Sequence, residues 1–169
     1  MELKVRLVEI NELEFMIKLS QSVQIWLRNR SSLQEIEVSK QEAITAINRE
    51  IAYFILFMDN PAPIGMILVD KKPSDHVISL LHLENCGQVI FLSKFMLDPD
   101  YIGQGIGEQF LNTVLPNAIP ITNQILALDC WAGNENLRKL YQKCGFTLFG
   151  VFPEQDWEIA VYVRPTIKD

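Results

Sequence analysis

A glycine-rich segment in the second half of the chain has the residue types that a phosphate site needs. Residues 101–107 read YIGQGIG and lie between an apolar run ending at Leu97 and a predicted helix. Main-chain N–H groups at a strand-to-helix turn, together with the helix N-terminus, can hold a phosphate, and glycine lets the backbone come close to it. The segment therefore predicts a site for a phosphate-containing ligand.

Two familiar phosphate-binding loops fit this segment poorly. The P-loop ends in Gly-Lys-Ser/Thr, which is absent here, and the dinucleotide fingerprint needs an acidic residue about 20 positions further on. Asp129 lies 22 residues after Gly107, but it falls inside a later predicted strand of a chain whose first half reads as antiparallel. A nucleotide-binding α/β protein is therefore the least favoured hypothesis.

A second segment, residues 134–146, combines polar and aromatic residues at helical spacing. Asn134 is typical of a helix N-cap, and Gly145 is placed to end the helix in a left-handed turn. The apolar residues between them recur at i, i+3, i+4 and i+7: Leu137, Leu140, Tyr141 and Cys144. Periodicity alone makes Tyr141 part of an apolar face, although a phenol with a pKa of about 10 is also able to protonate a thiolate.

Together the two segments resemble the signature motifs of the GNAT superfamily of N-acetyltransferases, in the order and at the separation usual there. Residues 97–107 are similar to a strand ending in V-x-P followed by the pyrophosphate loop Q/R-x-x-G-x-G/A. Residues 134–146 are similar to N-x-x-A-x-x-L-Y-x-K-x-G-F. The sequence departs from these patterns at Ile102, where glutamine or arginine is preferred, and at Leu137, where alanine is usual. The resemblance covers roughly residues 53–163.

This resemblance implies direct transfer of an acetyl group from acetyl-CoA to a primary amine of a small molecule, peptide or protein. It implies that the strand before the loop and Asn134 bind the pantetheine arm, that the loop binds the pyrophosphate, and that Tyr141 protonates the departing thiolate. The residues that it assigns to acetyl-CoA are Phe95, Met96, Leu97, Ile102, Gly103, Gln104, Gly105, Ile106, Gly107, Asn134 and Tyr141.

No motif identifies the general base or the acceptor. We place Glu84 beside Tyr141 as the predicted catalytic pair, with His82, Asp129 and a water-relayed base as alternatives. Three tryptophans, Trp26, Trp131 and Trp157, could present faces to a cationic acceptor, and Trp131 is favoured because it precedes Asn134. Ile102 and the missing base also leave a different class open, namely a non-catalytic regulatory domain that binds acyl-CoA.

Apolar patterning predicts the elements around these motifs. Alternation predicts a strand at residues 3–7, helical spacing follows at 9–30, and a capping box predicts a second helix at 39–52. A helix at 108–115 should end or kink at Pro116, and residues 71–88 stay open between helix and strand. Further strands are predicted at residues 53–58, 64–69, 89–97, 125–130, 146–152 and 157–163.

We therefore expect one domain spanning residues 1–169, of the α/β class (α+β type) with a GNAT-like fold. Its centre should be a mostly antiparallel sheet of six or seven strands flanked by about four helices. The sheet should open between the strands that end at Leu97 and Cys130, to admit acetyl-CoA.

Composition limits the partners. Fifteen basic and 21 acidic residues give a formal charge of −6, which suits a cationic acceptor and offers nucleic acid no broad attraction. The cysteines, Cys86, Cys130 and Cys144, show neither disulfide nor zinc-ligand spacing, so no metal is expected. No run approaches the roughly 20 apolar residues of a membrane span, and the first residues lack a signal-peptide pattern. We expect a cytoplasmic protein without membrane contact, able to form a homodimer.

Overall fold

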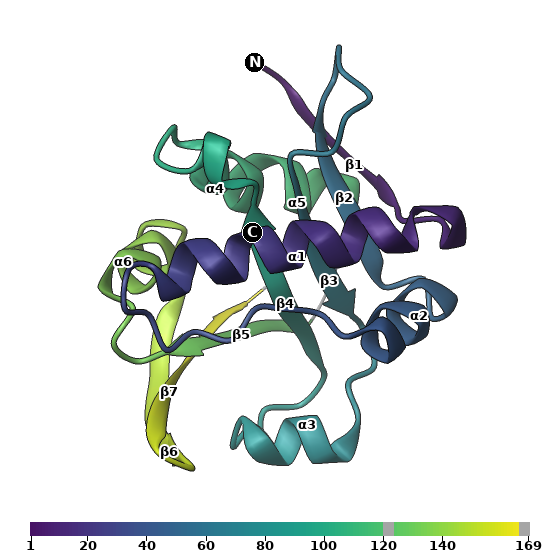
Figure 1. Cartoon of the computed structure of the whole chain (residues 1–169). Helices are drawn as coiled ribbons and strands as arrows, with labels where there is room; N and C mark the ends of the chain where they lie inside the picture. The colour runs from purple at the N-terminus through teal and green to yellow at the C-terminus, as the bar shows by residue number, and fades with distance from the viewer. Residues whose placement is uncertain (120–123, 166–169) are drawn as a thin grey trace.

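Seven strands form one sheet in the computed structural model, which describes residues 1–119 and 124–165 (Figure 1). Their order across the sheet is β1-β2-β3-β4-β5-β7-β6, and every neighbouring pair is antiparallel except β4 and β5. The strands are β1 Leu3–Leu7, β2 Ala52–Phe57, β3 Gly65–Asp70, β4 Val89–Leu97, β5 Ile125–Trp131, β6 Thr147–Glu154 and β7 Trp157–Pro165. The predicted fold class is confirmed.

Helices cover both faces of this sheet (Figure 1). On one face, α1 and α2 pack on β2, β3 and β4, while α3 packs near β5 and β7. On the other face, α4, α5 and α6 enclose the largest apolar cluster. The helices are α1 Leu13–Arg28, preceded by the short turn η1 Ile10–Glu12, then α2 Lys40–Asn48, α3 Asp75–Leu80, the turn η2 Pro99–Tyr101, α4 Ile106–Gln109, η3 Phe110–Val114, α5 Leu115–Ala118 and α6 Glu135–Lys143.

Helix α2 has the predicted capping box but ends earlier than its apolar spacing suggests. Ser39 accepts a hydrogen bond from the Glu42 N–H at 3.1 Å. At the other end Glu50 is left-handed, with φ of 57°, and the Ile51 N–H donates to the Ala46 carbonyl at 3.1 Å. This is a Schellman ending, so the helix stops at Asn48 although the apolar pattern continues. The open segment 71–88 contains the helix α3, capped by Ser74.

The helix predicted at 108–115 begins two residues earlier and continues past Pro116. Residues 106–118 form one helical segment whose middle turn, η3, is π-helical, with the Leu115 N–H bonded to the Phe110 carbonyl. Proline has no N–H to donate, and the Leu111 carbonyl instead accepts a hydrogen bond from the Arg164 guanidinium at 3.4 Å. A side chain from β7 thus supplies a donor to a carbonyl of the π-helical turn, and the helical segment continues past Pro116 to Ala118.

The sheet opens between β4 and β5, as predicted. Their parallel pairing is limited to Val89 with Ile125, Ile90 with Leu126 and Phe91 with Ala127. Beyond Phe91, β4 pairs with β3 alone and carries one extra residue, since Met66 pairs with Met96 whereas Leu68 pairs with Ser93. Lys94 in this bulge is left-handed, with φ of 50°. The main-chain edge of β4 that faces β5 is thus left without a strand partner from residue 92 onward, among the residues described.

Gly65 allows β3 and β4 to approach closely beside the opening. It pairs with Leu97, and a Cβ added there would overlap the Met96 carbonyl oxygen.

We expect Gly65→Ala to lower the free energy of unfolding by about 2–4 kcal/mol, because main chain must move to make room. Urea denaturation measures this loss. As a control, Gly107→Ala brings its methyl group to 3.3 Å from the end of the flexible Leu140 side chain and should lose far less; equal losses would contradict the account.

Candidate active site

A cavity of ≈ 340 Å³ lies where β4 and β5 separate, and residues from both faces of the sheet line it. From the face covered by α4 to α6 come Leu111, Leu137 and Tyr141, and from the opposite face comes the loop that connects α1 and α2. We call this connection, residues 29–39, the α1–α2 loop. The remaining wall consists of Ile67, Leu68, residues 91–95, Leu128, Asp129, Glu42 and Trp157. The cavity therefore joins the two sides of the sheet at the gap.

Tyr141 lies in this cavity as a fixed and neutral phenol. Its side chain is only 3% exposed, and its ring packs edge-on against Tyr162, with centroids 5.7 Å apart. Arg138 in turn donates a hydrogen bond to the Tyr162 hydroxyl at 2.9 Å. Burial, and then the nearby Cys130 and Asp129, raise the pKa of Tyr141 well above its ordinary value. Within the described residues its hydroxyl has no hydrogen-bond partner, so it is free to serve a ligand.

Of the three residues considered as a base, Glu84, His82 and Asp129, only Asp129 lies in the cavity wall. Burial, and after it the charge of Glu154, raise the pKa of Asp129 from the ordinary 3.8 to about 6, while a hydrogen bond from its own main chain and the charge of Lys94 oppose the shift. In the part of the chain that the structure describes, no other side chain donates a hydrogen bond to this carboxylate. The neighbouring Cys130 thiol has its pKa raised to about 12, again mainly by burial. Burial thus disfavours the charged forms of Asp129 and Tyr141 in this cavity.

The α1–α2 loop forms one wall of the cavity and is held by two buried polar residues of α1. The Gln24 side-chain oxygen accepts hydrogen bonds from the Ile36 and Glu37 N–H groups at 2.7 and 2.9 Å, and its amide donates to the Gln34 carbonyl at 2.9 Å. The Ser20 hydroxyl accepts from the Val38 N–H at 2.9 Å. Sequence reasoning missed this pair, whose signal is two polar residues, four apart, on the apolar face of α1.

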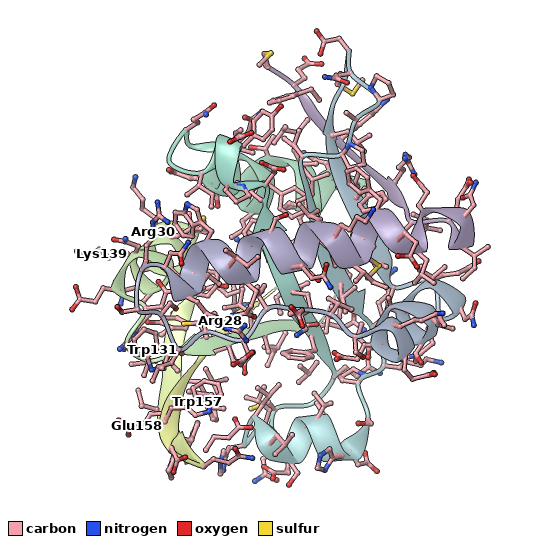
Figure 2. All side chains as sticks on the ribbon, viewed as in Figure 1. Arg28, Arg30, Trp131, Lys139, Trp157 and Glu158 are labelled. Atoms are coloured by element: carbon pink, nitrogen blue, oxygen red, sulfur yellow. The ribbon has the colours of Figure 1, made fainter. Side chains whose placement is uncertain are left out.

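The tryptophans divide between the cavity and the surface. Trp157 lines the cavity, and Trp131 lies on the same face of the sheet, since it pairs with Ile159, two residues from Trp157 (Figure 2). The main-chain N–H of Trp131 donates a hydrogen bond to the side-chain oxygen of Gln34 at 2.6 Å, which connects β5 to the α1–α2 loop. Trp26 instead carries Arg30 stacked 3.7 Å from its ring centroid, and it is not part of the cavity.

The glycine-rich segment presents main chain to open space at the start of the helical segment 106–118. Gly103 and Gly105 have φ of 84° and 78°, and a Cβ added at either would meet nothing within 4 Å. Such positive φ values favour glycine. Ile102 is 37% exposed, and Gln104 donates a hydrogen bond to the Asp100 carbonyl. These exposed N–H groups at a helix start fit a pyrophosphate.

The remaining residues that the sequence analysis assigned to acetyl-CoA lie on β4 and at the start of α6. Phe95 lines the cavity and stacks on Phe110, with centroids 5.4 Å apart. Met96 is buried against the cluster of α1 and α2, and Leu97 packs on the opposite side. Asn134 caps α6 as predicted, accepting a hydrogen bond from the Leu137 N–H at 3.2 Å.

Glu84 and His82 lie away from these groups. Both are exposed on the connection between α3 and β4, and neither lines the cavity. The His82 ring stacks on Phe152, with centroids 3.9 Å apart. The structure therefore brings Tyr141 and Asp129 to one cavity and leaves Glu84 outside it.

Residues 1–119 and 124–165 contain neither a metal-binding cluster nor a membrane-spanning helix. No three His, Cys, Asp or Glu side chains in that part of the chain are grouped closely enough to hold a metal ion. No helix there combines the length and apolar character that crossing a membrane requires.

Comparison with known proteins places this site in context. Residues 14–146 match the model of the Acetyltransferase (GNAT) family. A GNAT family acetyltransferase from Streptococcus agalactiae has a TM-score of 0.80 at 16% identity, covering 98% of this chain and 96% of that one. A GNAT family acetyltransferase from Listeria monocytogenes has a TM-score of 0.74 at 20% identity, covering 97% and 95%. Aminoglycoside acetyltransferase AAC(6')-Ib, in complex with coenzyme A and kanamycin, has a TM-score of 0.71 at 15% identity, covering 97% and 95%. No curated protein matches the sequence significantly.

The raised pKa of Asp129 predicts a pH-dependent gain in stability on substitution. Because the folded-state pKa of about 6 exceeds the ordinary 3.8, this group stabilises the fold at low pH and that contribution is lost as pH rises through 6. Asp129→Asn should therefore raise the free energy of unfolding at about pH 8 by up to about 3 kcal/mol, and by almost nothing near pH 4. Urea titrations at several pH values measure this. An equal gain at both pH values would instead implicate the amide group.

Proposed function

Because this chain belongs to the Acetyltransferase (GNAT) family and is an N-acetyltransferase, we propose that it moves the acetyl group of acetyl-CoA directly to a primary amine in the cavity between β4 and β5. The family match bears out the resemblance that its two motifs carry. The observation that supports direct transfer is a single cavity lined from both faces of the sheet. Donor and acceptor are able to reach it from opposite sides.

The residues present fit acetyl-CoA. We assign the pyrophosphate to the main chain of residues 102–107 and the pantetheine arm to the open edge of β4 at residues 95–97 and to Asn134. Bound there, acetyl-CoA supplies a thioester whose carbonyl carbon accepts the amine and whose sulfur leaves. Main-chain N–H groups on the open edge of β4 are able to bind the carbonyl oxygen. Their lack of a partner in β5 makes them available for this role.

We assign the general base to Asp129. Its carboxylate lines the cavity and carries no ion pair, so it is able to take a proton from the amine nitrogen as the C–N bond forms. A pKa of about 6 keeps it largely ionised at neutral pH while making it a stronger base than an exposed aspartate. Glu84 was the base expected from sequence, but its exposed position outside the cavity favours Asp129.

We assign the general acid to Tyr141. Its hydroxyl is neutral and unpartnered in the cavity, and it donates its proton to the sulfur as the C–S bond breaks. Burial raises the pKa of the phenol, which by itself weakens it as an acid. Burial also raises the pKa of the nearby Cys130 thiol, to about 12, and the same effect on a CoA thiol beside the buried Tyr141 would make its departing thiolate a stronger base. Proton transfer from Tyr141 to the sulfur stays feasible because burial raises the pKa of the phenol and the pKa of the departing thiol in the same direction.

Composition and cysteine chemistry support the remaining proposals. The formal charge of −6 suits a cationic acceptor and disfavours nucleic acid as a partner. All three cysteines are free, which suits a reducing compartment, so we propose a cytoplasmic location. The strands at both ends of the sequence join one sheet, so we propose a single domain.

The first test combines acetyl-CoA binding with turnover. Acetyl-CoA should raise the thermal midpoint of the protein, and CoA should be released over a panel of amines. Tyr141→Phe should slow CoA release about 10²- to 10⁴-fold while leaving the rise in midpoint intact, because the phenyl ring still fills its place. Tyr53→Phe, a hydroxyl removed outside the cavity, is the control.

Each outcome of this test is informative. A rise in midpoint without CoA release from any amine would favour a non-catalytic domain that binds acyl-CoA. No rise at all would refute the assigned donor site. Equal activity in Tyr141→Phe and the parent protein would remove Tyr141 from the mechanism.

The pH dependence of turnover tests the base. With Asp129 as base, kcat/KM should rise with pH through about 6, separately from a second rise at about pH 10 as the amine itself loses its proton. Asp129→Asn should remove the rise near pH 6 and lower the rate above it. A rise near pH 6 that persists in Asp129→Asn would assign it to another group.

A further inference from the structure

We propose that the acceptor carries a second positive charge besides the reacting amine, and that Asp129, Glu154 and Trp157 form the site that recognises this di- or polycationic amine. The inference rests on the proposed function and adds to it the chemical class of the acceptor. It follows from the charges, aromatic rings and strand register around the acceptor side of the cavity.

The charged side chains that line the cavity are mostly acidic. Three are acidic, Glu35, Glu42 and Asp129, and one is basic, Lys94. Lys94 donates a hydrogen bond to the Glu37 carbonyl at 3.2 Å, and Glu42 completes the capping box of α2. Glu35 lies 3.9 Å from Arg28 in an exposed pair. Among the described residues Asp129 alone of these carboxylates has no ion pair and no partner beyond its own main chain.

Glu154 adds a second unpaired carboxylate on the same face as Asp129. Asp129 pairs with Val161 of β7, and Glu154 of β6 pairs with Trp157 of β7. Trp157 and Val161 are four residues apart on one strand, so all four side chains point to the same side of the sheet. Within the described part of the chain Glu154 has no ion pair or hydrogen bond, and its charge acts on Asp129. Two carboxylates that repel each other in this way leave a place for a cation.

Aromatic rings complete the site. Trp157 lines the cavity beside Glu154, and Trp131 follows on the same face (Figure 2). Cations of this chain stack on Trp26, Phe54 and Phe146. None of the described cations stacks on Trp131 or Trp157. The Trp157 ring, which lines the cavity beside Glu154, is suited to an ammonium group with an alkyl chain.

The same features disfavour other acceptors. An amine that also carries a carboxylate would bring a third negative charge beside Asp129 and Glu154. An amine with an uncharged tail would leave the half-buried Glu154 without an ion-pair partner, and so would gain nothing from its charge. A dicationic amine places its neutral, reacting nitrogen at Asp129 and its second ammonium group near Glu154 and Trp157.

Binding to the CoA-saturated protein tests this directly. A series of α,ω-diamines of increasing length should be titrated by calorimetry beside monoamines and ω-amino acids of matching length, with CoA release measured in parallel. The best diamine should bind at least about 10-fold more tightly than its matching monoamine, as a charged hydrogen bond implies. The ω-amino acid should bind more weakly than either, and the preference for the diamine should shrink at high salt.

Two variants assign the preference to its residues. Glu154→Gln should lose about 10-fold in diamine affinity and raise KM more than it lowers kcat, with little change for the monoamine. Glu158→Gln is the matched control, because Glu158 is exposed, next to Trp157 on β7, and points away from the cavity (Figure 2). It should behave like the parent protein.

The outcomes separate this inference from the proposed function. Protein that takes up no acetyl-CoA and releases no CoA from any amine would refute the proposed function. If the protein binds acetyl-CoA but binds the diamine no more tightly than the monoamine, only the inference that the acceptor carries a second positive charge is overturned. A diamine preference that survives Glu154→Gln would also overturn the assignment of this site.

Discussion

The separation of β4 from β5 is the constraint on which the rest of the structure depends. Parallel neighbours normally satisfy each other's main-chain groups along their whole length, yet these two share three register pairs. Buried main-chain N–H and C=O groups need partners, so the open edge of β4 requires a ligand or water. The bulge at Lys94 and the close approach at Gly65 hold β4 on the β3 side. The gap is therefore a consequence of how β4 pairs with β3.

The gap also explains why the proposed acid, Tyr141, and the proposed base, Asp129, have similar surroundings. Tyr141 and Asp129 reach the cavity from different layers, a helix on one face and the strand beside the gap. Burial is the leading cause of the raised pKa of each. Burial keeps the phenol protonated and makes the carboxylate a stronger base, because it disfavours the charged form of each. One buried environment could thus suit both proposed roles.

Sequence patterns predicted the strands and the two motif segments, because apolar periodicity and glycine positions are local properties, whereas the opening of the sheet was expected from the resemblance to the GNAT superfamily. They could not separate Glu84 from Asp129, since only the strand register shows that Asp129 faces the gap while the connection after α3 leads Glu84 to the surface. The path past Pro116 depends on Arg164, far along the chain, and so does not show in local spacing. The hydrogen bonds of Ser20 and Gln24 are equally non-local, since their partners follow the end of α1.

The way in which α1 holds the α1–α2 loop bears on how such an enzyme can diversify. Gln24 and Ser20 bond to main-chain atoms of residues 34, 36, 37 and 38, and these atoms are the same whatever side chains the loop carries. The loop side chains facing the cavity are therefore free to change while its path is retained. A lineage that keeps the two polar residues could exchange one acceptor for another by a few substitutions in this loop, with the donor half of the molecule untouched.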